Sequence, residues 1–380
     1  MKKITRRDAL KGATAGFMIV SPQVAFSYQA NSQVSLGLIG TGNRGQYVAG
    51  MFVNDPRTKL TAICDIRPER IDQAKTVIPG ADKVPAYKDL HELLNRQDID
   101  AVYIATPVWL HPEHFEAAVN AHKNIYCEKP AGADVAGVKR LMRAAEKNPG
   151  KTMQFGFQQR FSPEYLAAEK ILRDGSVGDL TLMYSFWITA GNDFPGVPTP
   201  KPQTEMDRII QWARWKATSG DFIVEQDCHG VDVLNWFAKA HPETALGDGG
   251  RYRRQYGDNY DHYNISYRYP GGLRGWLLGT QLPANHYADV KEQFFGSLGS
   301  LETNRRYYKW FKTSPRNPVT VEAKREITID AVEAFLNSVL TGKPINMVQI
   351  AAESTLTSIL GRMAGEQKRE VSWEEMMRSA

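Results

Sequence analysis

Residues 35–45, with the sequence SLGLIGTGNRG, constrain the fold of this chain more than any other stretch. A short apolar run ends in a G-x-G-x-x-G spacing, and a helical pattern begins directly after it. In this order Gly40 permits a tight turn, Gly42 lets the backbone approach a pyrophosphate, and Gly45 lets helix and strand pack closely. The free amide groups at the start of the helix then face the phosphates. The stretch therefore predicts a dinucleotide-binding turn.

An acidic residue supports this interpretation. A second strand is expected at residues 60–64, and Asp65 follows it, where a carboxylate would bond the ribose hydroxyls of NAD. Asp65 would also repel the 2′-phosphate of NADP, although Arg67 could bend back and accept that phosphate. The alternative is an ordinary glycine-rich loop beside a capping Asp. We predict NAD, with NADP not excluded, and the expected contacts in this region are Gly40, Gly42, Asn43, Arg44, Gly45 and Asp65.

Composition bounds the class of protein. A length of 380 residues predicts two domains, and 42% hydrophobic with 23% charged residues is typical of globular chains. No apolar run is long enough for a membrane span. Of the formal net charge of +5, residues 1–30 contribute +4, with five cations against one acid, which leaves +1 for the remainder. A nucleic-acid partner is therefore not expected.

The N-terminal stretch TRRDALK at residues 5–11 resembles the twin-arginine export signal, and a moderately apolar segment follows it. Ala9 stands where such signals carry an aromatic residue, so the alternative is a disordered basic tail with an uncleaved helix. We expect residues 1–30 to be a signal peptide and the mature protein to be periplasmic or exported. The route carries folded proteins, so an exported enzyme would leave with its cofactor bound and would have to regenerate it in place.

Strands that alternate with helices predict a doubly wound parallel sheet. The expected strand at residues 99–105 ends in Thr106-Pro107, where ligands bind in open α/β sheets, and the strand at residues 124–127 ends in Glu128-Lys129-Pro130. His111 and His114 lack a third ligand nearby, and the three cysteines show no metal spacing. No metal site is predicted.

Taken in order, several motifs make the chain similar to the glucose–fructose oxidoreductase and inositol dehydrogenase (Gfo/Idh/MocA) family of NAD(P)-dependent sugar oxidoreductases. The matching stretches are Gly40–Gly45, Thr106 through His111, Glu128-Lys129-Pro130, Gly156–Phe161 and Glu225–His229. The resemblance implies a Rossmann domain at residues 31–155. It also implies an α/β domain at residues 156–380 with a large open, mostly antiparallel sheet, which forms one wall of the site and an oligomer interface. Further cofactor contacts implied by it are Thr106, Pro107, His111, Glu128 and Lys129.

Residues 221–236 are predicted to form one helix, on which Glu225 and His229 are spaced i, i+4 and share a face. The resembled family has Asp-x-x-x-His here, and Glu225 replaces the Asp. Oxidation of a secondary alcohol requires a base for the hydroxyl proton, and His229 has an ordinary pKa near ~6.5 that suits this role. Glu225 would orient the ring or, because its side chain is longer than that of Asp, contact the substrate directly. The alternative from the residues alone is a surface helix pair worth ~0.3–0.5 kcal/mol.

Lys129 is the third predicted catalytic residue. It would hydrogen-bond and polarise the reacting oxygen. Burial beside a cationic nicotinamide would depress the pKa of Lys129 and allow a proton relay. Weaker substrate candidates are Arg160 and Asp232, and the aromatic residues Tyr184, Trp187, Trp212 and Trp215 could stack on a sugar, although core packing is commoner for aromatics.

Three functions fit these residues. The first is an oxidoreductase that transfers hydride between tightly bound NAD(P) and a hydroxyl-bearing carbon of a sugar or polyol. The second is a glycoside-cleaving enzyme that uses bound NAD for oxidation, elimination and reduction. The third is a sugar-binding protein without activity, against which the presence of both Lys129 and His229 argues, since binding alone does not require both. The first two need the same pair of residues, and both remain open.

Overall fold

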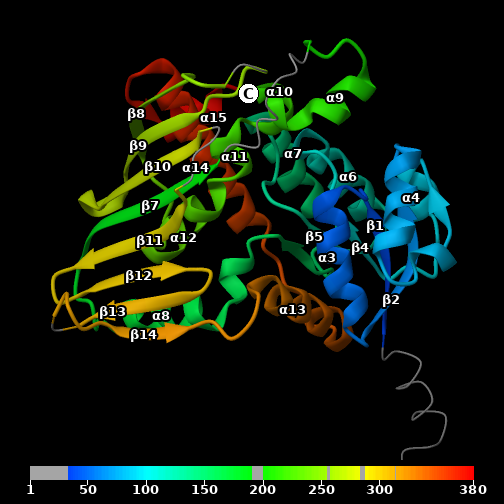
Figure 1. Ribbon diagram of the computed structural model, residues 1–380, viewed down its shortest axis with the longest axis horizontal. Coiled ribbons are helices and arrows are strands. Elements are labelled where there is room, and N and C mark those ends of the chain that lie inside the picture. The colour runs from blue at the N-terminus through cyan, green and yellow to red at the C-terminus, as the bar shows by residue number, and fades with distance from the viewer. Residues whose placement is uncertain (1–32, 191–199, 255–256, 283–286, 313) are drawn as a thin grey trace, which may run out of the picture.

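A computed structural model describes residues 33–190, 200–254, 257–282, 287–312 and 314–380 (Figure 1). The predicted signal peptide and most of the predicted loop at residues 191–202 lie outside these ranges. None of the described helices is both long and apolar enough to cross a membrane.

The N-terminal sheet contains six described strands, all parallel, in the order β3-β2-β1-β4-β5-β6. Their bounds are β1 Val34–Ile39, β2 Thr58–Cys64, β3 Ala86–Tyr87, β4 Ala101–Ile104, β5 Asn124–Cys127 and β6 Met153–Phe155. The connecting helices are α3 Asn43–Asn54, α4 Pro68–Val77, α5 Leu90–Leu94, α6 His111–Asn120 and α7 Val135–Ala145. The strand order reverses between β1 and β4, and ligands of such sheets bind at the carboxyl ends of the strands there. The predicted doubly wound fold is confirmed.

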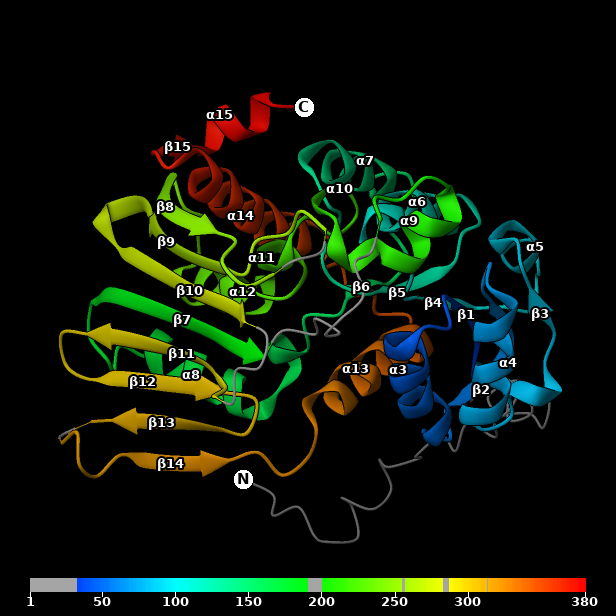
Figure 2. The same cartoon turned by 45° about the horizontal axis from the view of Figure 1, so that its top comes forward.

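A helix from the end of the chain completes the packing of this sheet. Helix α13 (Ile327–Thr341) lies beside α3, as Figures 1 and 2 show. Phe335 meets Phe52 and Tyr126 edge-on, with ring centroids 5.9 and 5.6 Å apart. All three side chains are fully buried, so the core of the N-terminal sheet contains residues that are almost 300 positions apart in the sequence.

The second sheet has nine described strands in the order β14-β13-β12-β11-β7-β10-β9-β8-β15. Among the pairs described, only β7 and β10 run parallel, which confirms the predicted mostly antiparallel sheet. The strands are β7 Leu180–Ala190, β8 Thr244–Gly250, β9 His262–Arg268, β10 Arg274–Leu282, β11 Asp289–Gly296, β12 Ser300–Asn304, β13 Tyr307–Phe311, β14 Val319–Glu322 and β15 Val371–Ser372.

Helices cover one face of this sheet. They are α8 Pro163–Arg173, α12 Cys228–Ala238 and α14 Val348–Gln367, and the short α15 Trp373–Arg378 follows β15 (Figure 2). Side chains alternate along β7: Ser185 and Trp187 are buried and contact α12, whereas Tyr184 and Phe186 are only partly buried. Because successive strand residues point to opposite faces, Tyr184 lies on the face away from α12.

The single helix predicted for residues 221–236 is wrong. The structure has a short α11 (Phe222–Glu225), a break at Gln226 and Asp227, and then α12. In a continuous helix the Glu225 carbonyl would accept the backbone N–H of His229. That N–H instead approaches the Gln226 carbonyl, and the Glu225 carbonyl accepts Lys129 Nζ. A contact from the first domain thus takes the place of a helix hydrogen bond.

Candidate active site

The glycine-rich turn between β1 and α3 has the shape that its residues predict. Gly40 has φ +92°, and a Cβ there would lie 2.6 Å from the Ala105 carbonyl oxygen. A Cβ on Gly45 would lie 2.1 Å from the Gly40 carbonyl oxygen. Beside Gly42, by contrast, nothing lies within 4 Å of the ideal Cβ position. Glycine is required at positions 40 and 45 by close backbone contacts, whereas Gly42 borders open space.

This open space suits the pyrophosphate of a dinucleotide. Helix α3 begins at Asn43, and its N-cap residue Gly42 offers no side-chain cap. The first amide groups of a helix lack intrahelical partners, and together with the helix dipole they favour a bound anion. The residues present therefore fit the phosphates of the predicted cofactor.

Asp65 lies at the carboxyl end of β2, as the ribose contact requires. Its carboxylate accepts hydrogen bonds from the Thr41 backbone N–H at 2.8 Å and the Thr41 hydroxyl at 3.0 Å, and from the Arg67 N–H at 3.0 Å. Asp65 therefore also fixes the glycine-rich turn. The guanidinium of Arg67 does not bend back toward this site; it pairs with Glu69 at 2.7 Å.

Glu128 and Arg44 connect the turn to the fifth strand. Arg44 Nε donates to Glu128 Oε1 at 2.8 Å, and the Tyr103 hydroxyl donates to the same oxygen at 3.0 Å. Glu128 Oε2 is buried without a described partner and lies against Gly156, where a Cβ would be 2.5 Å away. Glu128 thus holds Arg44 in place. From the sequence Glu128 was predicted to contact the cofactor, and this positioning role was not foreseen.

His111 and His114 fix the ends of the neighbouring strands. The two ring nitrogens of His111 lie 2.7 Å from the Pro130 carbonyl oxygen and 2.8 Å from that of Thr106. His114 Nδ1 lies 3.0 Å from the Thr106 hydroxyl. Burial lowers the pKa of both rings, that of His114 to about 4. His111 is only 1% exposed, so it links the Thr106-Pro107 and Lys129-Pro130 segments and has no free nitrogen to offer a ligand. The described residues contain no metal-binding cluster.

Lys129 is held by Glu225 from the second domain. Its Nζ donates to the Glu225 backbone carbonyl and lies 3.2 Å from the Glu225 carboxylate. Burial is the largest single effect and lowers the pKa of Lys129, but Glu225, Cys228 and Glu128 together raise this pKa above its ordinary value. The depression of this pKa that is predicted beside a bound cationic nicotinamide stays a prediction. Lys129 is a charged hydrogen-bond donor.

His229 has the opposite electrostatic setting. Its ring is 5% exposed, stacks on Trp187 with centroids 5.4 Å apart and an interplanar angle of 14°, and meets Phe157 edge-on at 6.0 Å. Burial lowers the pKa of His229 well below 6.5, and the cations Arg305, Lys129 and Arg44 lower it further. Nδ1 has no hydrogen-bond partner among the described residues. The structure thus pairs Glu225 with Lys129 and not, as predicted, with the ring of His229.

The weaker substrate candidates separate into two groups. Arg160 and Asp232 bind each other through contacts of 2.9–3.0 Å, and Ser354 Oγ also donates to the Asp232 carboxylate at 2.7 Å. The ion pair ties the 3₁₀ turn Gln158–Phe161 to α12, and the Ser354 hydrogen bond ties α12 to α14, which gives Arg160 and Asp232 a structural role. Trp187 faces His229, whereas Tyr184 lies on the opposite face of β7. Trp212 and Trp215 lie in and directly after a 3₁₀ turn (Trp212–Arg214), and the structure shows no contact of either with His229.

The sequence reasoning missed two charged residues near this centre. Asp227, in the break between α11 and α12, is fully buried, and neither carboxylate oxygen has a described partner. Burial raises the pKa of Asp227, and the neighbouring Asp221 and Glu225 raise it further. Arg305 lies in the turn between β12 and β13, although residues 305–311 read as one strand from the sequence. The i, i+4 spacing indicated Glu225 and His229, and it does not include Asp227 or Arg305.

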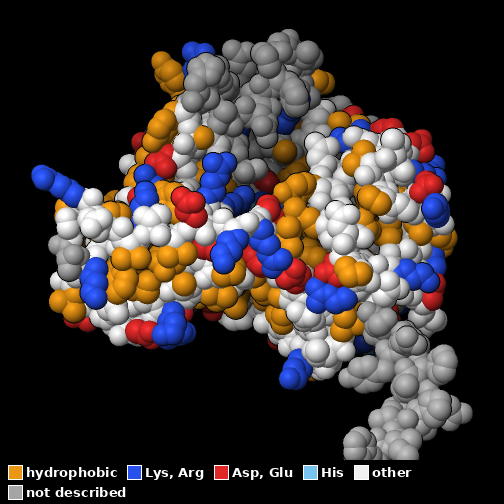
Figure 3. Space-filling view, turned by 60° about the horizontal axis from the view of Figure 1, so that its bottom comes forward, with side chains coloured by type: hydrophobic (Ala, Val, Ile, Leu, Met, Phe, Trp, Pro, Cys, Tyr) orange, Lys and Arg blue, Asp and Glu red, His pale blue; other side chains and the backbone are white. Residues whose placement is uncertain are grey.

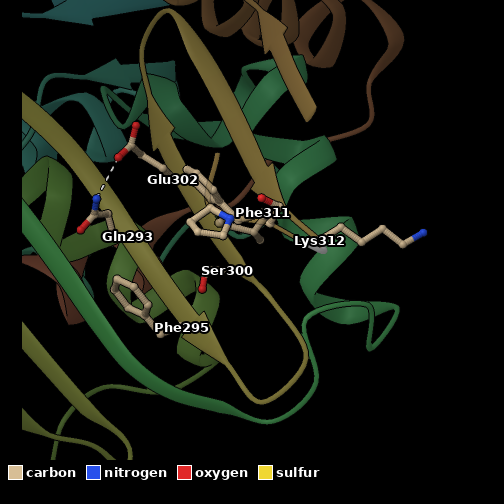
Figure 4. A pocket seen from close by; sticks show the side chains of 9 residues that line it. Gln293, Phe295, Ser300, Glu302, Phe311 and Lys312 are labelled. Carbon is tan, nitrogen blue, oxygen red and sulfur yellow. Dashed lines mark hydrogen bonds between the residues drawn. The ribbon is translucent and has the colours of Figure 1, made fainter. Parts of the chain in front are cut away.

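A separate pocket of about 400 Å³ lies on the open face of the second sheet. Figure 4 shows its lining, which includes Gln293, Phe295, Ser300, Glu302, Phe311 and Lys312. Gln293 pairs in register with Tyr184, so the pocket is on the face away from His229. It is not part of the site described above.

Comparison with known proteins places the chain in a family. Residues 34–157 match the oxidoreductase family with an NAD-binding Rossmann fold, and residues 165–302 match the GFO/IDH/MocA C-terminal domain. An uncharacterised oxidoreductase, YrbE, of Bacillus subtilis (strain 168) is 32% identical over 272 residues, 70% of this chain and 73% of that protein. Myo-inositol 2-dehydrogenase of Thermotoga maritima is 24% identical over 366 residues, 90% of this chain and 99% of the other.

Among solved structures, levoglucosan dehydrogenase in complex with NADH and levoglucosan shares the fold. Its TM-score is 0.77 at 17% identity, and the match covers 90% of this chain and 99% of that one. The family models span both domains, and the Lys129–Glu225 contact joins the same two domains at the predicted site. The chain therefore belongs to the GFO/IDH/MocA family and is an NAD-dependent oxidoreductase.

Proposed function

We propose that the protein oxidises a secondary hydroxyl group of a sugar or polyol with tightly bound NAD. The arrangement that carries this proposal is a Lys129 amine held 3.2 Å from the Glu225 carboxylate, together with a His229 ring buried against Trp187. The pKa of Lys129 is raised, which favours its charged form, and that of His229 is lowered, which favours its neutral form. The relatives named for myo-inositol and levoglucosan support a substrate rich in hydroxyl groups. Trp187 is only 4% exposed and stacks on His229, so it supports the ring of the base.

In this mechanism the protein's own residues handle the proton and the developing charge. NAD, when bound at Gly40–Gly45, supplies the hydride acceptor. Neutral His229 takes the hydroxyl proton as general base. Lys129 donates a hydrogen bond to the substrate oxygen as negative charge develops there. Glu225 keeps Lys129 protonated and fixes its position, so it acts through Lys129 and not through the imidazole.

We expect Lys129→Ala and His229→Ala each to reduce turnover about 10²–10⁴-fold, because each removes one half of a single proton transfer. The double variant should lose little more than the worse single variant. Bound NAD should remain in all three, since the glycine-rich turn is intact. The measurement is single-turnover reduction of bound NAD against a panel of sugars, polyols and glycosides, with nucleotide content determined by extraction. Near-normal turnover in His229→Ala with cofactor bound would place the base elsewhere.

The pH profile tests the assigned protonation state of His229. A base must be neutral to act, and its pKa is lowered, so oxidation should be lost only as pH falls below the ordinary value of 6.5. We expect the acid limb of kcat/KM to have its midpoint below that value. The profile should be measured from about pH 4 to about pH 8, with circular dichroism as a check that the fold persists. An acid midpoint at or above 6.5 in folded protein would contradict a buried neutral imidazole.

We further propose that two copies of the chain associate through the open face of the second sheet. Tyr184 and Trp276 stack there with centroids 5.2 Å apart, and Phe295 meets Tyr184 edge-on at 5.8 Å. Hydrophobic side chains also gather in patches on the side of the molecule that Figure 3 shows. Aromatic residues are enriched in the buried centres of interfaces.

Trp276→Lys should convert the oligomer to monomer, because it places an unpaired charge in the centre of that face. The measurement is sedimentation equilibrium of the purified protein. Leu298→Lys is the control, since Leu298 is 68% exposed in the β11–β12 turn, away from the aromatic group. A monomeric wild-type protein, or an oligomer unaffected by Trp276→Lys, would rule out this interface.

We also propose export of the folded, cofactor-bound protein by the twin-arginine route, supported by Arg6-Arg7 and the apolar segment that follows. The double variant Arg6→Lys with Arg7→Lys should keep full-length precursor in the cytoplasm. Cell fractionation and immunoblotting measure this, and Lys2→Arg with Lys3→Arg is the charge-matched control. Undiminished export of the first double variant would refute the assignment.

A further inference from the structure

Arg305 is a cation near the site that has no counterion among the residues that the structure describes. It lies in the turn between β12 and β13, and its guanidinium carbon sits 5.4 Å from the ring centroid of Trp187. Its Nε is buried and has no hydrogen-bond partner among the described residues. The other two cations of the site differ: Lys129 pairs with Glu225 at 3.2 Å and Arg44 with Glu128 at 2.8 Å.

The position of Arg305 relates it to the catalytic base. The Trp187 ring that it covers is the ring that stacks on His229. After burial, Arg305 is also the first of the cations that lower the pKa of His229, so it acts on this ring electrostatically. In the space-filling view, Lys and Arg side chains gather with a few acidic ones between the sheet domain and the Rossmann domain (Figure 3).

The nearby carboxylates are engaged elsewhere. Glu292 accepts the Tyr165 hydroxyl at 2.9 Å and the Thr303 hydroxyl at 2.8 Å. Glu326 caps α13 by accepting the Thr328 N–H at 2.7 Å. Both act on Arg305 electrostatically, but neither forms an ion pair with it among the described residues. A largely desolvated guanidinium without such a partner is costly to keep.

We propose that Arg305 binds a carboxylate of the substrate, so that the preferred substrates are sugar acids of the uronate class. The inference rests on the proposed sugar oxidation and narrows its substrate. An Arg guanidinium suits a carboxylate because its planar fork donates two parallel hydrogen bonds. The phosphates of the cofactor are the other possible anion. The placement of Arg305 on Trp187, beside the base that must meet the reacting hydroxyl, favours the substrate.

The experiment compares neutral sugars with their acids: glucose with glucuronate and galactose with galacturonate. NAD-loaded wild-type protein is tested for turnover and, by calorimetry, for binding of each member. The acid should be preferred about 10- to 100-fold in at least one pair, the range expected for a charge-assisted hydrogen bond. Arg305→Met should abolish the preference, because it weakens binding and turnover of the sugar acid and leaves those of the neutral sugar unchanged. Arg305→Lys should retain part of the preference. Arg306→Met, at the exposed neighbouring position, should behave as wild type.

The outcomes separate this proposal from the parent function. Equal responses to both members of every pair, including no response, overturn the carboxylate site. If the neutral sugars nevertheless reduce bound NAD normally, the proposed oxidation stands without it. A third outcome is that Arg305→Met loses NAD at an unchanged melting temperature and keeps the same preference between the members of a pair. This result would assign Arg305 to a cofactor phosphate and would likewise overturn the proposal.

Discussion

The contact between Lys129 and Glu225 determines most of what is distinctive in this site. It joins the end of a Rossmann strand to a segment 96 residues further along the chain. It removes the Glu225 carbonyl from helix hydrogen bonding and so separates α11 from α12. It also helps to keep Lys129 charged, because burial lowers the pKa of Lys129 and the Glu225 carboxylate contributes most to raising it again. One interaction thus aligns the two domains, shapes the local backbone and prepares a hydrogen-bond donor.

The charges around His229 form a consistent arrangement. Three cations and a hydrophobic enclosure all disfavour the imidazolium, which leaves the ring ready to accept a proton. Two of those cations are balanced by carboxylates of the protein. The third cation is Arg305. The Trp187 ring contacts both Arg305 and His229 and carries no negative charge that could balance the arginine. Burial that disfavours charge on His229 also raises the free energy of an unpaired Arg305 cation. A bound anion would balance that cation and lower this free energy.

Much of this could be predicted from local sequence. The glycine spacing fixed the first turn, because Gly40 and Gly45 meet backbone atoms that no side chain could approach. The start of α8 is set by local sequence, because Ser162 caps its first turn and Pro163 stands at its first position. The helix break at Gln226 and Asp227 could not be predicted, because its cause is a lysine far away in sequence. Period-two alternation separates Tyr184 from Trp187, but only the packing of α12 shows which of them faces the base. No sequence pattern indicated a functional role for Arg305, since its neighbours Trp187 and His229 are brought near it only by the fold.

The return of α13 to the first sheet has a consequence for the order of events during synthesis. Phe335 belongs to the core of the dinucleotide domain, yet the ribosome reaches it only after the whole second sheet has been made, apart from its short edge strand β15. Until then Phe52 and Tyr126 lack one of their ring neighbours, and the helix α3 that presents the glycine-rich turn is packed on one side only. Domains often complete their folding from the N-terminus during translation. In this chain the core of the dinucleotide domain can be completed only when the polypeptide is nearly complete.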